Sequence, residues 1–95
     1  MKPKNKLINN IEIISTVLED GVLVEVKLKN GFRQAKKYSI IFYDKNSGEL
    51  VYSDYNVKPG MYSKCTRNDI DLLVKVICRE RLIYEKTFLK TKENN

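Results

Sequence analysis

This sequence contains no histidine and no tryptophan, and only two cysteines and two prolines. Without histidine, no Ser-His or Cys-His nucleophile pair can form, and acid–base catalysis at neutral pH loses its commonest agent. Two carboxylates can still cleave a glycosidic bond, but the pairs Glu19-Asp20 and Asp69-Asp71 lie at predicted turns. The glycines are isolated and form no phosphate-binding loop. We therefore predict a protein that is not an enzyme and binds no cofactor.

Cysteine is too scarce for a metal site. Zinc takes four Cys, His or carboxylate ligands, usually in closely spaced pairs, and the isolated thiols of Cys65 and Cys78 do not supply them. A hairpin turning at Asn68-Asp69 would place Cys65 near Leu72 and away from Cys78, which argues against a disulfide. We expect Cys78 in the core and Cys65 near the surface.

Long apolar runs are absent as well. Segments such as Val22-Leu23-Val24 fall far short of the roughly 20 apolar residues that a membrane span needs. The first 25 residues contain no apolar run followed by a small-residue cleavage site, so they do not resemble a secretory signal peptide. As written, the sequence predicts a cytoplasmic protein outside the membrane, although a domain excised from a larger secreted protein would look the same.

The composition is that of one globular domain, with 42% apolar and 32% charged residues in a chain of 95. The net charge of +6 lies mainly in the ends: residues 7–85 contain 12 basic and 11 acidic side chains, whereas residues 1–6 and 86–95 contain six lysines and one glutamate. We expect a flexible basic tail at 1–6, one folded domain at 7–89 and a polar tail at 90–95.

Alternating apolar and polar side chains predict β-strands along most of the chain. The pattern is clearest at 22–29, where the even positions are apolar and Glu25, Lys27 and Lys29 point the other way. A capped helix is the alternative for the charged segment 69–86, but its β-branched residues and apolar spacing of two favour strands. Further strands are predicted at 11–17, 38–43, 50–53, 61–66, 70–79 and 82–88.

Turn residues separate these strands. Glu19-Asp20-Gly21 and Asn30-Gly31 flank the strand at 22–29 with residues that tolerate positive φ. Residues 44–49 indicate a hairpin loop, and Pro59-Gly60 predicts a type II turn because Pro fixes φ and Gly accepts positive φ. About seven short strands without a confident helix predict an all-β fold, a two-sheet antiparallel β-sandwich.

The alternation also predicts which side chains face the core. Tyr38 and Phe42 share one face of their strand, and Tyr43 points to the other. Tyr62 follows the Pro59-Gly60 corner, where a tyrosine often packs over the turn and bonds the backbone through its hydroxyl. In the last two strands the shared faces hold, first, Ile70, Leu72, Val74, Val76 and Cys78, and second, Leu82, Tyr84 and Phe88.

Two groups of side chains are candidate binding residues. Tyr43, Tyr52 and Tyr55 offer aromatic contact area with a polar tip at low entropic cost. Lys27, Lys29 and Arg79 offer positive charge. The tyrosines favour a non-catalytic interaction module that binds a carbohydrate or a protein. The alternative is a small basic stand-alone protein that binds an acidic partner or nucleic acid, although the absence of a basic, aromatic-lined groove makes nucleic acid the less favoured partner.

The order of the tyrosine motifs resembles a known family. The motifs are Tyr38 with its aromatic run, Glu49-Leu50-Val51-Tyr52, Tyr55, Gly60-Met61-Tyr62 and Leu73-Val74-Lys75-Val76. Over residues 20–80 this order is similar to the triple-tyrosine β-sandwich domains that accompany bacterial polysaccharide-active and sensory proteins. In that family the last strand directly follows the corner tyrosine, whereas residues 63–69 intervene here. The resemblance implies an immunoglobulin-like or fibronectin type III-like accessory domain that is non-catalytic and works with a larger partner.

Overall fold

The chain forms seven antiparallel β-strands in a computed structural model that describes residues 11–29 and 36–91. The expected tail at 1–6, the Asn30-Gly31 turn and residues 92–95 lie outside the described residues. Within them, no helix is long and apolar enough to cross a membrane. The strands are β1 (Ile11–Leu18), β2 (Gly21–Leu28), β3 (Tyr38–Asp44), β4 (Leu50–Val57), β5 (Tyr62–Cys65), β6 (Leu72–Cys78) and β7 (Arg81–Phe88).

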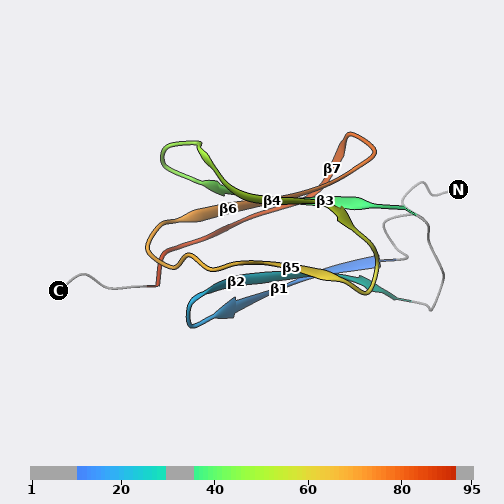
Figure 1. Cartoon of the computed structure of the whole chain (residues 1–95), viewed down its shortest axis with the longest axis horizontal. Coiled ribbons are helices and arrows are strands. Elements are labelled where there is room, and N and C mark those ends of the chain that lie inside the picture. The colour runs from blue at the N-terminus through green and yellow to red at the C-terminus, as the bar shows by residue number, and fades with distance from the viewer. Residues whose placement is uncertain (1–10, 30–35, 92–95) are drawn as a thin grey trace, which may run out of the picture.

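The strands form two sheets that pack face to face (Figure 1). One sheet has three strands in the order β1-β2-β5, and the other has four in the order β4-β3-β6-β7. The prediction of an all-β sandwich is confirmed, and the segment at 69–86 forms strands and not a helix. The edge strands β1 and β7 meet where the Ser15 hydroxyl and the Tyr84 hydroxyl share a hydrogen bond of 2.6 Å.

The core lies between the sheets and follows the predicted alternation. Most even-numbered residues of the three central strands are buried because successive side chains of a strand point to opposite faces. Burial of each such apolar side chain contributes about 1.5–3 kcal/mol. These residues are Val22, Val24 and Val26 of β2, Tyr38, Ile40 and Phe42 of β3, and Leu72, Val74 and Val76 of β6.

Two predicted turns are confirmed in detail. The Met61 amide donates to the Lys58 carbonyl at 2.9 Å, and Gly60 has a φ of 97°, as a type II turn requires. In the loop between β3 and β4, the Gly48 amide donates to the Asp44 carbonyl at 2.7 Å. The Asp44 carboxylate also accepts a hydrogen bond from the Asn46 amide at 3.0 Å, which fixes the start of this loop.

Two other turns differ from prediction. Gly21 has no positive φ; it is the buried first residue of β2, and a Cβ there would lie 1.9 Å from the carbonyl oxygen of Cys65. Glycine is therefore required for close contact between β2 and β5. Among the described non-glycine residues, positive φ occurs at Arg79 (53°) and Glu80 (64°), which form the two-residue turn between β6 and β7. The sequence did not reveal this turn, since it lacks the usual Asn-Gly pair.

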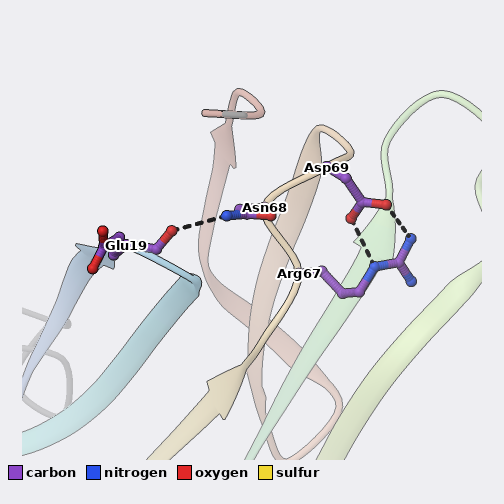
Figure 2. A network of polar contacts seen from close by, with 4 residues as sticks. All are labelled: Glu19, Arg67, Asn68 and Asp69. Atoms are coloured by element: carbon purple, nitrogen blue, oxygen red, sulfur yellow. Dashed lines mark hydrogen bonds and ion pairs between the residues drawn. The ribbon is translucent and has the colours of Figure 1, made fainter. Parts of the chain in front are cut away.

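The expected hairpin at Asn68-Asp69 is wrong. Strand β5 pairs with β2, so that Cys65 lies opposite Val22, and residues 66–71 cross from one sheet to the other. Figure 2 shows the side chains that stabilise this crossing. The Asn68 side-chain amide donates to the Glu19 carbonyl at 2.9 Å. The Arg67 guanidinium donates to both carboxylate oxygens of Asp69, at 2.9 and 3.3 Å.

The expected positions of the two cysteines are also wrong. Cys65 is buried in the core because β5 turns it inward opposite Val22, whereas Cys78 is only partly buried at the end of β6. Both are free thiols. In β7, a register shift next to Val76 leaves Leu82 exposed, so that Leu82 does not share the inner face with Phe88 as predicted. A bulge of this kind changes the face of every residue on one side of it.

Candidate functional site

On the outer face of the four-stranded sheet, apolar side chains lie among the polar residues Ser39, Ser53, Lys75, Glu85 and Thr87. Residues directly opposite each other in an antiparallel pair project from the same face, so the register defines this surface. Tyr43 lies between Leu50 of β4 and Leu73 of β6, and Ile77 of β6 lies opposite Leu82 of β7. We call this surface the apolar outer face; it consists of Ile41, Tyr43, Leu50, Leu73, Ile77 and Leu82.

Neighbouring side chains cover the apolar outer face unevenly. Ile41, near its centre, is only 8% exposed, whereas Leu50 and Leu82 at the two margins are 56% and 48% exposed. The Lys75 ammonium group lies 5.4 Å from the centre of the Tyr43 ring, a distance at which a cation is attracted to an aromatic face. The surface is thus a leucine and isoleucine patch with one tyrosine and one lysine near its middle.

The outer face of the three-stranded sheet is mixed in character. Glu12 lies opposite Lys27, and Thr16 lies opposite Leu23 on the same face. The Lys64 ammonium group lies 3.8 Å from the Asp20 carboxylate. This alternation of charged, polar and single apolar residues is typical of an antiparallel sheet with one face in water.

The tyrosine candidates do not form one surface. Tyr43 belongs to the apolar outer face. Tyr52 lies opposite Phe42, with ring centres 6.1 Å apart, so it occupies the edge of the core side and remains 45% exposed. Tyr55 is 56% exposed at an irregularity of β4, between the pairs that end at Asp54 and Val57. Of the three, Tyr43 alone is surrounded by apolar neighbours on an outward-facing surface.

Tyr62 contradicts its predicted role. It is 60% exposed on β5 opposite Glu25, far more than expected of a tyrosine that packs over the Pro59-Gly60 corner. Alternation explains the difference, because the inward positions of this short strand belong to Ser63 and Cys65.

An open groove follows the side of the sandwich where β4 and β5 meet. Its volume is about 330 Å³, and its wall includes the exposed ring of Tyr52. The remaining lining residues are Val51, Lys64, Cys65, Thr66 and Arg67.

The basic candidates are also separated. Lys27 lies on the outer face of the three-stranded sheet and Lys29 directly follows β2, whereas Arg79 lies in the β6–β7 turn of the other sheet. The three therefore do not share one strand face. Arg79 instead lines a hollow of about 220 Å³ at one end of the sandwich, which we call the basic pocket. Its lining residues are Ile11, Lys36, Tyr38, Cys78, Arg79, Arg81 and Ile83.

Sequence reasoning missed Lys36 and Arg81 in this pocket. Their proximity depends on the pairing of β3 with β6, which places Ser39 opposite Ile77 and so brings the residues before β3 beside the β6–β7 turn. At the same place, burial raises the pKa of the Tyr38 hydroxyl; Cys78 adds to this rise and the positive charge of Arg79 opposes it. Knowledge of the strand order would have revealed the cluster.

The paired carboxylates make structural contacts. Asp69 accepts the hydrogen bonds of Arg67, and the Asp71 carboxylate accepts one from the Lys90 amide at 2.8 Å. Across the described ranges, no three Cys, Asp or Glu side chains gather in a way that would hold a metal ion. No protein-family model, no curated protein and no solved structure matches this chain.

Proposed function

We propose that this protein is a non-catalytic β-sandwich interaction module that binds a protein partner through the apolar outer face. One observation carries the proposal: six apolar side chains lie on the outer face of the four-stranded sheet, and two of them, Leu50 and Leu82, are 56% and 48% exposed. The solvent-facing side of an antiparallel sheet normally carries polar residues. Leu50 and Leu82 are about half exposed, and covering them with another apolar surface would lower the free energy.

The composition of the apolar outer face favours a protein over a carbohydrate. Leucine and isoleucine side chains bury apolar area but offer no hydrogen bond to a sugar hydroxyl. Tyr43 provides an aromatic anchor of the type enriched at the centre of protein interfaces. Ser53 and Glu85, on the edge strands, add polar groups next to these apolar side chains.

The strand order supports a more specific form of this proposal, an immunoglobulin-like or fibronectin type III-like accessory domain. In immunoglobulin domains the third, sixth and seventh strands of the constant type share one sheet, and the first, second and fifth lie in the other. The orders β1-β2-β5 and β4-β3-β6-β7 keep these two groups of strands apart in the same way, but β4 pairs with β3 here, whereas the fourth strand of the constant type lies in the sheet of the first, second and fifth. Together with the tyrosine motifs, this order supports membership in the triple-tyrosine family as part of the proposal.

A matched pair of variants tests the partner surface. Leu73 and Leu23 are both partly buried and both project outward from an interior strand of their sheet. We expect Leu73→Lys and Leu23→Lys each to change the free energy of unfolding by less than about 1 kcal/mol, because the lysine stem can lie along the sheet.

The two variants are expected to differ in binding. Wild type and Leu23→Lys, used as baits in lysate of the source cell, should capture the same protein. Its purified form should bind Leu73→Lys about 30-fold more weakly, as expected when a buried contact worth about 2 kcal/mol is lost. Equal binding by both variants, or no specific capture by wild type, would contradict the proposal.

The second candidate is a small basic protein that binds an acidic partner or nucleic acid. It is supported by the cations Lys29, Lys36, Arg79 and Arg81, which lie at the end of the sandwich where β2 ends and β3 begins. If duplex DNA is the partner, the logarithm of the binding constant should fall with the logarithm of salt concentration with a slope near −0.9 per neutralised phosphate. Absence of DNA binding at low salt would remove the nucleic-acid form of this candidate.

A further inference from the structure

The basic pocket combines three cationic side chains with apolar walls. Lys36, Arg79 and Arg81 provide the charge, and Ile11 and Ile83 provide apolar surface from both sheets. The pocket lies at the end of the sandwich where β6 turns into β7. That turn is at the upper right of Figure 1. It is separate from the apolar outer face and does not depend on the function proposed for that face.

Strand pairing builds this pocket from distant segments. Strand β3 runs antiparallel to β6, so Lys36 approaches the β6–β7 turn. The two-residue turn places Arg79 and Arg81 on either side of Glu80, and both arginines line the hollow whereas Glu80 does not. Ile11, the first residue of β1, closes the hollow from the other sheet.

The positive charge of the pocket is not balanced by its own walls. No acidic residue is among the described lining residues, and the ion pairs found in residues 11–29 and 36–91 involve Lys64 and Arg67 instead. Three like charges around one hollow repel each other, although solvent weakens this repulsion because Arg79 and Arg81 are exposed. An anion in the hollow would add attractive interactions with all three cations that offset their mutual repulsion.

The backbone holds Arg79 in an unfavourable conformation. Positive φ at two successive positions suits Asn-Gly, and side-chain-bearing residues such as Arg79 and Glu80 are strained there. Backbone strain of this kind is concentrated at functional sites, where a side chain must be held in place. Arg79 therefore lines the pocket from a turn that Asn or Gly would form with less strain.

We propose that the basic pocket binds a small organic anion, a carboxylate or phosphate attached to an apolar body about the size of one aromatic ring. The guanidinium groups of Arg79 and Arg81 would donate charge-assisted hydrogen bonds to the anionic group. The apolar body would lie against Ile11 and Ile83. At about 220 Å³ the pocket is smaller than the roughly 300–1,000 Å³ of drug-sized sites, which limits the ligand to a small molecule or one terminal group of a larger one.

Phenyl phosphate is the first probe, titrated into the full chain by calorimetry at low salt. Inorganic phosphate and phenol, the two halves of the probe, serve as comparisons, and benzoate replaces phosphate by carboxylate. We expect saturable binding of one phenyl phosphate or one benzoate per chain, at least tenfold tighter than either half. The tighter of these two probes identifies the anionic group. If neither probe binds saturably, or if inorganic phosphate binds as tightly as phenyl phosphate, the proposal fails.

Substitutions in the turn separate binding from folding. Arg79→Asn removes the charge but keeps a residue that accepts positive φ, and so the midpoint of thermal unfolding should not fall. Its affinity for the tighter probe should fall about tenfold, as should that of Arg81→Gln. Glu80→Gly is the matched control: it relieves strain in the same turn and should keep wild-type affinity. Wild-type affinity in both arginine variants would overturn the proposal, as would an equal loss in Glu80→Gly.

Discussion

The two sheets of this sandwich have similar inner faces and different outer faces. Valines and larger apolar residues fill the inner face of both, among them Val24 of the three-stranded sheet and Val74 of the four-stranded sheet. On the outside, the three-stranded sheet alternates charged and apolar residues, whereas the four-stranded sheet presents the apolar outer face. The core requires only one apolar face per sheet. The exposed apolar side chains on the outside of the four-stranded sheet are the basis of the proposed partner surface.

The largest expected effect concerns the three-stranded sheet alone. In Gly21→Ala the added methyl group would meet the Cys65 carbonyl oxygen at 1.9 Å, so β5 must move away from β2. We expect a loss of about 3 kcal/mol in the free energy of unfolding, measured by urea denaturation. Hydrogen exchange should become faster in β2 and β5 before it does in β3 and β6.

Gly48→Ala is the control for this prediction. Gly48 has a φ of 80° and no atom within 4 Å of an added Cβ, so only backbone strain of about 1 kcal/mol is expected. Equal losses in the two variants would show that close packing of β2 against β5 is not what requires glycine at position 21.

A smaller effect is expected where the edges of the two sheets are joined. Tyr84→Phe and Ser15→Ala each remove one partner of the hydrogen bond of 2.6 Å between β7 and β1. Each change should lower the free energy of unfolding by about 1 kcal/mol, and the double variant should lose little more than either single one. Tyr55→Phe, which alters an exposed hydroxyl, should change stability by less than about 0.5 kcal/mol. Strictly additive losses in the Ser15 and Tyr84 variants would contradict the contact.

The smallest effect is a dependence of stability on pH that comes from the three-stranded sheet. Burial raises the pKa of the Cys65 thiol, and the charge of Arg67 opposes this rise only in part. Above about pH 8.5 the thiol ionises in the unfolded chain but stays protonated in the folded one. The free energy of unfolding should therefore fall with rising pH, by no more than about 1.4 kcal/mol per pH unit.

Cys65→Ala isolates this contribution. Cys78 is present in both proteins, so its contribution to stability cancels when the two are compared. Because the pKa of the Tyr38 hydroxyl is raised, this group titrates at higher pH in the folded protein. Between pH 8.5 and 9.5 under reducing conditions, the variant should lose less stability than wild type does. Identical slopes would show that ionisation of Cys65 is not linked to folding.

Much of the fold could be predicted from the sequence because strand patterns and turn residues are local signals. The valines of β2 and the Pro59-Gly60 turn belong to this class. The pairing of β5 with β2 is not local, since residues 66–71 contain no feature that distinguishes a crossing between sheets from a hairpin. The mistaken position of Cys65 follows from that error, whereas Cys78 is less buried than expected because it lies at the end of β6.

The candidate sites were less predictable for the same reason. Alternation correctly turned Tyr43 away from the core, but its apolar neighbours Leu50 and Leu73 come from two other strands. The basic pocket likewise needs the strand order to bring Lys36 beside Arg79. A sequence shows which side chains face outward, whereas the sheet order decides which of them form one surface.

The most direct test of the partner surface is an NMR titration of methyl-labelled protein with the protein that wild type captures. It compares both outer faces in one experiment, because Leu73 and Ile77 report on the four-stranded sheet while Ile14 and Leu23 report on the three-stranded sheet. We predict that binding shifts or broadens the methyl signals of Leu73 and Ile77 and leaves those of Ile14 and Leu23 unchanged. Changes confined to Ile14 and Leu23 would contradict the central claim.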